Sequence, residues 1–393
     1  MLNTRFSPWP SFTDEEAASV YRMLLSNKVN YWTGTECRAF EKEFAAWAGT
    51  EYAVALANGT LALDLALKAF GIGPGDEVVV TPRTFFASAA CIVNAGAVPV
   101  FADVDRDSQN ITADTIGVVL TPRTRAIICV HLAGMPCDMD PIMALARQHG
   151  LHVIEDCAQA HGARYKGRMV GSIGHIGAWS FCQDKIMTTG GEGGMVTTND
   201  RRLWSAMWSF KDHGKSWGAV YEREHPPGFR WVHDSFGTNW RMLETQAAIG
   251  RIQLRRMSAW SAQRRANAQS IAATCRRYAA VRVPAVPADV EHANYKFYAF
   301  VEPDQLADGW TRERIVDEIG ARGVPCLQGT CPEVYLEQAF AGTGLRPRER
   351  LKVARELGEN SLMFLVHPTL TGEEIDQTCR AIAQVLEMAG PAR

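Results

Sequence analysis

Short apolar runs alternate with helical stretches between residues 77 and 200 of this 393-residue chain. The runs are short and often β-branched, which is typical of buried strands. They predict strands at residues 77–82, 99–105, 126–132, 152–158 and 177–182. The stretches between them predict helices at residues 84–96, 112–120 and 140–150. This alternation predicts an α/β fold, with a mostly parallel sheet covered by helices on both faces and with its chemistry at the carboxyl ends of the strands.

The pattern changes after about residue 250. Residues 251–280 combine apolar and arginine-rich positions at helical spacing, which predicts a long amphipathic helix that bridges two domains. A strand and two helices follow, at residues 295–303, 311–323 and 370–390. We therefore expect a large domain with an N-terminal arm, and then the bridging helix with a smaller α+β domain, at residues 1–250 and 251–393.

Composition and charge exclude several function classes. Apolar residues make up 47% and charged residues 21% of the chain, and the formal net charge is -2. This charge gives no general attraction to nucleic acid or to an anionic membrane, so the arginines of the long helix are expected on a solvated face. No apolar run approaches the roughly 20 residues of a membrane span.

The start of the chain and its cysteines predict a cytoplasmic protein. The first residues, MLNTRFSPWPSFTDEE, lack a basic segment followed by an apolar stretch and are not expected to be a signal peptide. The ten cysteines are scattered without a CxxC pair. That pattern favours a reducing compartment over a disulfide scaffold or a zinc site.

A turn between a strand and a helix is the first candidate ligand site. Residues 55–71 read ALANGTLALDLALKAFG, with a turn at Asn58 and Gly59 and a helix that begins at Thr60. Free backbone N–H groups at a helix N-terminus bind phosphate, and glycine lets the backbone approach closely. An ordinary helix cap has the same residue types, so both interpretations stay open here.

Two adjacent carboxylates, Glu155 and Asp156, stand where a predicted buried strand ends. Burying them is costly unless a cation pairs with them, either in a structural ion pair or as a functional carboxylate. The functional cation would be a protonated ring nitrogen or a metal ion. No HExxH motif or similar ligand cluster accompanies them, so we expect no metal. His161, nearby, is expected to be a hydrogen-bonded histidine.

Lys185 follows another predicted strand and precedes the glycine-rich stretch TTGGEGG. Most lysines are solvated, but partial desolvation at a strand end favours the neutral amine, which forms Schiff bases with aldehydes. Pyridoxal 5'-phosphate (PLP) has a phosphate, a ring nitrogen and an aldehyde. The three candidate features, a phosphate site, a carboxylate and an amine, match these three groups. Phe85, after another strand, is available to cover the ring.

With these features the chain resembles, nearly end to end, the DegT/DnrJ/EryC1/StrS family of PLP-dependent sugar aminotransferases, which has the fold type I of aspartate aminotransferase. The matching segments are PSFTDEEAASV (10–20), YWTGTECRAFEKEFAAWAG (31–49), NGTLAL (58–63), TPRTFFASA (81–89), EDCAQAHGA (155–163), SFCQDKIMTTGGEGGM (180–195), GTNWRMLETQAAIGRIQL (237–254) and LTGEEID (370–376).

The resemblance implies that the cofactor phosphate is held by Gly59, Thr60 and the hydroxyl of Ser180. Asn239 lies in NWRM, which corresponds to the NYRM motif of the family. It would reach the phosphate in the neighbouring subunit, so a homodimer with active sites at the subunit interface is implied.

The resemblance also assigns the residues around the cofactor ring. Lys185 would bind the aldehyde, and Asp156 would keep the ring nitrogen protonated. Phe85 would stack on the ring, and Gln159 would pack beside it near the 3-hydroxyl.

The resemblance also places Trp32, His213 and Arg241 near the active site, as candidate substrate residues. Arg241 would clamp the carboxylate of the amino donor or would form a structural ion pair.

The resemblance implies an aminotransferase that moves the amino group of L-glutamate to a keto or aldehyde sugar, either nucleotide-linked or a sugar acid. Such a reaction serves amino-sugar biosynthesis for surface polysaccharide, lipopolysaccharide or a natural product. A branch of the family has histidine in place of the lysine and dehydrates sugars, which Lys185 argues against. Residues 329–340, GTCPEVYLEQAF, depart from the GTxxHY stretch that is common in the family, and this leaves the usual nucleotide-sugar acceptor open. A dehydratase, a cysteine desulfurase-like lyase and a non-catalytic regulator that binds PLP or a sugar are the alternatives.

Overall fold

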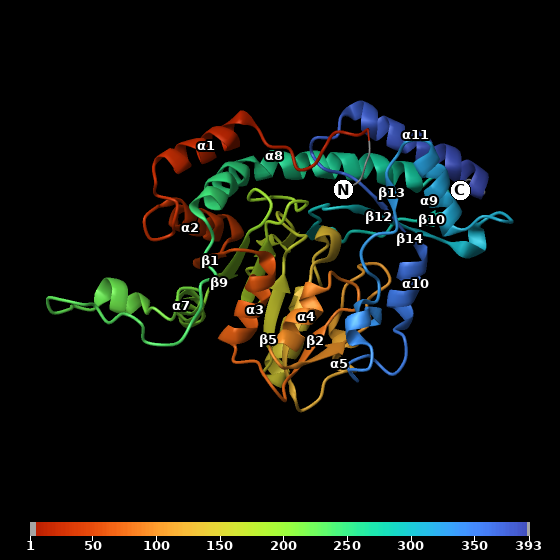
Figure 1. The fold of residues 1–393 in the computed structure, drawn as a ribbon. Helices are drawn as coiled ribbons and strands as arrows, with labels where there is room; N and C mark the ends of the chain where they lie inside the picture. The colour runs from red at the N-terminus through yellow and green to blue at the C-terminus, as the bar shows by residue number, and fades with distance from the viewer. Residues whose placement is uncertain (1–4, 391–393) are drawn as a thin grey trace.

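A seven-stranded sheet forms the centre of the computed structural model, which describes residues 5–390 (Figure 1). Residues 1–4, part of the segment expected not to be a signal peptide, and residues 391–393 lie outside the described part. Within it, β9 runs antiparallel to both neighbours and the other pairs of this sheet are parallel, which confirms the prediction of a mostly parallel sheet. The strands, in spatial order, are β1 (Tyr52–Leu56), β9 (Gly194–Thr198), β8 (Ile176–Ser180), β5 (His152–Asp156), β4 (Thr124–Val130), β2 (Glu77–Val80) and β3 (Val98–Phe101).

Helices cover both faces of this sheet because alternate residues of each strand point to opposite sides. Val78 and Val80 of β2 belong to one apolar core, and Val79 between them belongs to another. The first core includes α3 (Gly59–Ala69), α4 (Ala87–Asn94) and α7 (Arg201–Phe210). The second includes α5 (Ala113–Gly117) and α6 (Met139–His149).

A second, four-stranded antiparallel sheet forms the C-terminal part of the fold, to the right in Figure 1. Its strands, in spatial order, are β10 (Val281–Arg282), β12 (Phe297–Val301), β14 (Ser361–Phe364) and β13 (Cys326–Leu327). The helices of this part are α9 (Arg312–Ala321), α10 (Lys352–Asn360) and α11 (Gly372–Ala389). A small three-stranded sheet has the order β11 (Val290–Glu291), β6 (Arg164–Tyr165) and β7 (Arg168–Met169).

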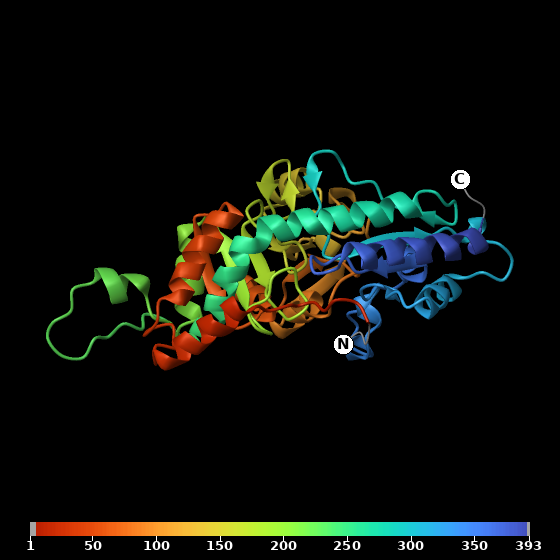
Figure 2. The same cartoon turned by 90° about the horizontal axis from the view of Figure 1, so that it is seen from above.

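Helix α8 (Glu244–Cys275) runs along the top of both sheets (Figures 1 and 2). It begins seven residues before the predicted start, so it crosses the division at residue 250, which remains a prediction. Several of its arginines form ion pairs with α1 (Asp14–Leu25) and α2 (Glu36–Ala48), rather than facing only solvent as expected. Arg251, for example, lies 2.6 Å from both Glu36 and Glu43.

The first described residues join the two parts of the fold. Phe6 packs in the core of the C-terminal part, with α11 and β12. Three residues later, the Trp9 indole donates a hydrogen bond to the carbonyl of Lys185, at 2.9 Å. No helix within residues 5–390 has the length and apolar character needed to cross a membrane.

The segment between α7 and α8, residues 211–243, extends away from the rest of the molecule on the left in both views (Figures 1 and 2). It contains one short π-helix, Gly218–Glu222. Large aromatic side chains on this segment are exposed, with Phe236 fully accessible and Phe229 and Trp231 about three-quarters accessible, at 73% and 77%. We call residues 211–243 the arm.

One buried carboxylate ties α8 to α2. Glu244 is fully buried, and its side-chain oxygens accept hydrogen bonds from the backbone N–H groups of Glu36 and Cys37 at the start of α2. A carboxylate at a helix N-terminus satisfies orphan N–H groups and complements the helix dipole.

We expect Glu244→Ala to lower the free energy of unfolding by about 2–3 kcal/mol, because two buried N–H groups lose a charged acceptor. Glu244→Gln keeps one acceptor oxygen and should lose less. Urea denaturation of both variants measures the difference, and a Glu244→Ala protein as stable as the parent would contradict this role.

Candidate functional site

A cavity of about 670 Å³ lies at the carboxyl ends of the parallel strands. Its walls come from the ends of β4, β5 and β8 and from the loops that follow β1 and β2. Another wall comes from the second sheet, with Tyr298 in β12 and with Tyr295 and Lys296 just before this strand. The cavity therefore stands between the two sheets, at the edge where the strand pattern predicted the chemistry.

The cavity brings together seven of the residues singled out from the sequence. They come from four separate segments of the chain and are Gly59, Thr60, Phe85, Asp156, Gln159, Ser180 and Lys185. The remaining four do not line the cavity in this chain, and they are Trp32, His213, Asn239 and Arg241.

The N-terminus of α3 faces the cavity with free donors. Asn58 caps the helix, since its side-chain oxygen accepts from the N–H of Leu61 at 3.0 Å. This leaves the N–H groups of Gly59 and Thr60 in the first turn without an intrahelical partner, so the cap and a phosphate seat coexist. A Cβ on Gly59 would lie 2.4 Å from the Cβ of Ser180, and this close approach of helix and strand requires glycine.

Asp156 is held at the end of β5 by two hydrogen bonds. Its Oδ2 accepts from the hydroxyl of Ser88 at 2.8 Å, and its Oδ1 accepts from the N–H of Ala158 at 3.1 Å. The carboxylate is 5% exposed and lines the cavity, which is an arrangement suited to a ring N–H cation. Gln159 accepts at Oε1 from the N–H of Ala133, which leaves its NH₂ group for a ligand.

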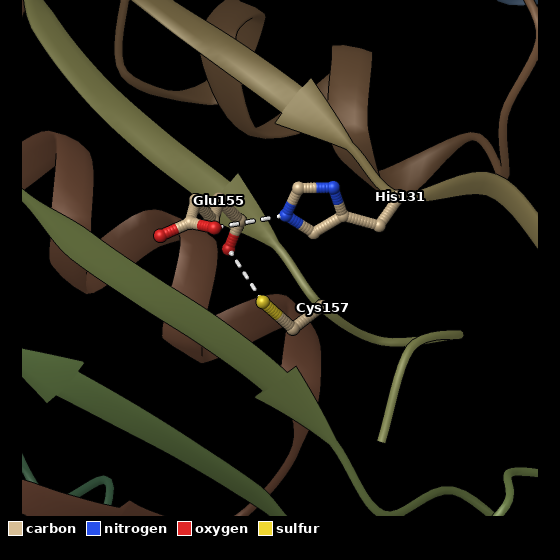
Figure 3. A group of neighbouring side chains, drawn as sticks. All are labelled: His131, Glu155 and Cys157. Carbon is tan, nitrogen blue, oxygen red and sulfur yellow. Dashed lines mark hydrogen bonds and ion pairs between the residues drawn. The ribbon is translucent and has the colours of Figure 1, made fainter. Parts of the chain in front are cut away.

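The neighbouring carboxylate, Glu155, points away from the cavity and is paired with His131 at 3.0 Å (Figure 3). His131 accepts at Nδ1 from the N–H of Cys137, so its Nε2–H donates to Glu155. Burial would raise the pKa of Glu155, but the hydrogen bonds from His131 and the backbone hold it below its usual value. Glu155 is thus the structural carboxylate, and Asp156 is the one available to a ligand.

Glu155, His131 and Cys157 form a compact group whose ligand atoms all lie within 4.8 Å of one another (Figure 3). Both ring nitrogens of His131 are already engaged, one as acceptor and one as donor. The Cys157 thiol contacts the backbone carbonyl of Glu155 at 3.6 Å, and burial raises its pKa well above the ordinary value. The group is a hydrogen-bonded part of the core and offers no free histidine nitrogen to a metal ion.

Lys185 follows β8 in a turn with glycines on its C-terminal side. Its amine lies 5.3 Å from the centre of the Tyr295 ring. The Tyr295 hydroxyl donates to Asp184, and this bond together with Lys185 lowers the pKa of Asp184 despite burial. Gly190 and Gly191 of TTGGEGG both have positive φ angles, 89° and 123°, so they form a turn that other residues adopt at a cost.

Arg241 and Trp32 belong to a separate cluster around buried Asp212. Arg241 forms an ion pair with Asp212 at 2.7 Å, and the Trp32 indole donates to the same carboxylate at 3.2 Å. Of the two interpretations of Arg241, the ion pair is the one present in this chain. His213 and Asn239 lie on the arm and are exposed.

The prediction that His161 is a hydrogen-bonded histidine was wrong. Neither ring nitrogen has a partner among the described residues, and the ring packs against Trp179 and Phe181. Burial lowers the pKa of His161 to about 3, and the positive charges of Lys185 and Arg264 act in the same direction.

Sequence reasoning missed several polar residues that line the cavity, among them Ser88, Asp184, Tyr295 and Lys296. Ser88 and Asp184 gave no signal of their own because hydroxyls and carboxylates are common in helices and turns. Lys296 gave only a weak one, since it stands at the start of an apolar strand, whereas Lys185 follows the end of one.

Comparison with protein families matches residues 10–383 to a model described as the DegT/DnrJ/EryC1/StrS aminotransferase family. GDP-perosamine synthase of Caulobacter vibrioides is 38% identical, with 88% of this chain and 89% of that protein covered. The dTDP-3-amino-3,4,6-trideoxy-alpha-D-glucose transaminase of Streptomyces venezuelae is 34% identical, with 95% and 92% covered.

A solved structure gives a close match to the fold. An aminotransferase from Psychrobacter cryohalolentis superimposes with a TM-score of 0.95 at 64% identity, with 97% of this chain and 99% of that chain covered. The cavity, the helix terminus and Lys185 thus lie in a chain whose sequence and fold both match aminotransferases.

The lowered pKa of His161 predicts how stability depends on pH. The unfolded chain takes up a proton on this ring near pH 6.5, while the folded protein does so only near pH 3, so stability is lost as the pH falls below 6.5. Over the interval from pH 7 to pH 5 this one group should cost about 2 kcal/mol.

His161→Phe and His161→Gln both remove the titrating ring but differ in packing. We expect a flatter loss of stability between pH 7 and pH 5 in both variants, measured by urea denaturation at each pH. Profiles parallel to that of the parent protein would rule out this origin of the acid sensitivity.

Proposed function

The chain belongs to the DegT/DnrJ/EryC1/StrS aminotransferase family, and we propose that it transfers the amino group of L-glutamate to a nucleotide-linked keto sugar. It is a PLP-dependent sugar aminotransferase of amino-sugar biosynthesis. The names of the two relatives, which refer to GDP-linked and dTDP-linked sugars, support a nucleotide-linked acceptor here. The observation that carries the proposal is the convergence of the α3 N-terminus, Asp156 and Lys185 on one cavity.

The residues of the cavity fit PLP in three ways. Two N–H groups of α3 are free at a place where only glycine permits close approach, which suits a phosphate. A buried carboxylate, Asp156, faces the same space, and an amine, Lys185, lines it too. Gly59, Thr60 and Ser180 would hold the phosphate, Phe85 would cover one face of the ring, and Gln159 would lie beside it.

The cofactor supplies an electron sink, since its protonated ring accepts the electron pair left when the donor loses its α-proton. Asp156 keeps the ring nitrogen protonated, because a carboxylate stabilises the N–H cation beside it. Ser88 and the N–H of Ala158 hold that carboxylate in place. The amine of Lys185 takes the α-proton of the donor and returns a proton to the sugar carbon in the second half of the reaction.

A homodimer completes the proposed site. The arm projects from the body with exposed aromatic side chains and carries Asn239 at an exposed position (Figure 1). Phe85, on the cavity wall, is 65% exposed in the single chain. We infer that the arm of one subunit packs on the other and brings Asn239 to the phosphate there.

A cytoplasmic location and a role in lipopolysaccharide or other surface polysaccharide belong to the same proposal. All ten cysteines are free, which is consistent with a reducing compartment. A dehydratase, a lyase and a regulator that only binds PLP or a sugar are the alternatives. Lys185 argues against the dehydratase, and the intact Lys185, Asp156 and Ser180 argue against the regulator. Amine transfer from L-glutamate separates the transaminase from a lyase.

We expect Lys185→Ala to abolish transamination, because the cofactor loses its covalent attachment and the proton carrier worth roughly 10²- to 10⁴-fold. The measurement is the absorbance change of the bound cofactor on adding L-glutamate, together with mass spectrometry of the products.

Asp156→Asn is the matched comparison, since it keeps the shape and one acceptor oxygen but removes the charge. This variant should bind PLP and react slowly. Normal rates in either variant would overturn the assigned roles, and a parent protein that shows no change with L-glutamate would favour the regulator.

The shared site predicts complementation between two inactive variants. Lys185→Ala and Asn239→Asp should each be inactive or nearly so, the second because a carboxylate repels the phosphate. Equal mixing after unfolding and refolding, or coexpression, gives mixed dimers with one complete site, so about a quarter of the parent activity should return. A mixture as inactive as its components would refute the contribution of Asn239 across the interface.

A further inference from the structure

The basic side chains of the cavity are few. Among the described residues that line it, Lys185 and Lys296 are the only lysines, and no arginine or histidine joins them. The acidic ones are Asp156, Asp184 and Glu192. Since Lys185 is committed to the aldehyde of the cofactor, Lys296 is the one cationic group that this chain leaves for a substrate.

Lys296 and Lys185 lie around the same aromatic ring. The Lys296 amine is 5.0 Å from the centre of the Tyr295 ring, and the Lys185 amine is 5.3 Å from it. Lys296 directly precedes β12 of the second sheet, and Lys185 lies in the turn after β8 of the first sheet. Residues far apart in the sequence thus place two amines beside one ring in one cavity.

The Lys296 ammonium forms no hydrogen bond and no ion pair with any described residue. The nearby carboxylate of Asp184 accepts a hydrogen bond from the Tyr295 hydroxyl instead. The pKa of Lys296 is lowered to about 8, chiefly by burial, with repulsion from Arg264 and Lys185 in the same direction and Asp184 opposing them. A cation in such a place is stabilised by an anion that enters the cavity.

Positive charge behind Lys296 strengthens this attraction. Arg264 is buried, and its Nε and one terminal nitrogen have no partner among the described residues. Two histidines nearby, His161 and His367, have pKa values lowered to about 3, first by burial and then by these cations. With these rings neutral, the charged side chains that line this end of the cavity are Lys185, Lys296 and Asp184, and Arg264 lies buried behind them.

The amino donor has the chemistry that this end requires. An α-amino acid carries a carboxylate on the same carbon as the amino group, and that amino group must reach the place where the Lys185 amine stands. A nucleotide-linked sugar brings hydroxyl groups to this place, and its negative charge lies on the diphosphate, several bonds from the carbon that reacts. Arg241, the clamp considered from the sequence, is paired with Asp212 and does not line the cavity.

We propose that Lys296 binds the carboxylate of the amino donor next to Lys185 and thereby determines that the donor is an amino acid. The inference rests on the proposed function, because it assigns a residue to the donor half of the same reaction.

The test uses the purified holoenzyme and its first half-reaction, which needs no knowledge of the sugar. L-Glutamate is mixed with the parent protein, with Lys296→Met and with Lys296→Arg, and the absorbance of the bound cofactor is followed in a single turnover. Lys296→Met should raise the L-glutamate concentration for half-maximal conversion about 10- to 100-fold, because a charge-assisted hydrogen bond is lost. Lys296→Arg keeps the charge and should recover most of that loss.

A reverse experiment checks that the effect belongs to the carboxylate. The protein loaded with pyridoxamine 5'-phosphate is mixed with 2-oxoglutarate, which has the same carboxylates, and Lys296→Met should again shift half-saturation by a similar factor. The melting temperature and the affinity for PLP should stay close to those of the parent, which separates substrate binding from a role in folding.

The outcomes are distinct. An unchanged half-saturation in Lys296→Met overturns the assignment of Lys296 and leaves the proposed function intact, provided that the parent protein reacts. A fall in the maximal rate alone, with half-saturation unchanged, also overturns it, since Lys296 would then act on Lys185. A parent protein that does not react with L-glutamate overturns the donor named in the proposed function instead.

Discussion

Parallel pairing of β4, β5 and β8 is the constraint on which the site depends. In this register Val130 pairs with Asp156, and Asp156 pairs with Ala178, so the last residues of three strands reach the same edge of the sheet. The loops after β1 and β2 reach that edge as well and carry the α3 N-terminus and Phe85. An antiparallel arrangement of these strands would send alternate ends to opposite edges and would separate the phosphate seat from the acid and the amine.

Within that frame, the alternation of a strand decides between two carboxylates that look equivalent in the sequence. Glu155 faces a core in which His131 and backbone N–H groups satisfy both of its oxygens. Asp156, one residue later, faces the cavity, where Ser88 and Ala158 fix its orientation. The desolvation of each is therefore offset by different partners, and one carboxylate becomes structural while the other is free to bind a ligand.

Electrostatics divides the cavity into two ends. Asp156 supplies negative charge where a ring nitrogen would lie. At the other end Lys185 and Lys296 line the cavity beside one carboxylate, Asp184, with the buried Arg264 behind them. Burial makes this division stronger, because charges interact more strongly where water is excluded. Phe85 on the cavity wall and the aromatic side chains of the arm are exposed in the single chain, and in the proposed homodimer a second subunit would cover them.

The sequence by itself determined the elements and the residues that local rules govern. Apolar periodicity predicted the strands and helices within a few residues, and the position of Asp156 and Lys185 at strand ends indicated their chemistry before any contact was known. Resemblance to a family added proposed roles for Ser180, Gln159 and Asn239. The predictions of strands, helices and turns succeed because strand alternation, helix capping and glycine turns depend on neighbours in the chain.

Tertiary structure alone decided what depends on distant residues. Helix α8 begins at Glu244 rather than near 251, and there the Glu244 carboxylate bonds to the start of α2 while Gln246 accepts from the N–H of Leu243. The partner of Arg241 is Asp212, His161 has no partner among the described residues, and Lys296 reaches the ring beside Lys185. Each outcome depends on which buried groups come into contact in the folded chain. A buried polar group that finds no partner there costs free energy, and neighbours in the sequence do not determine this.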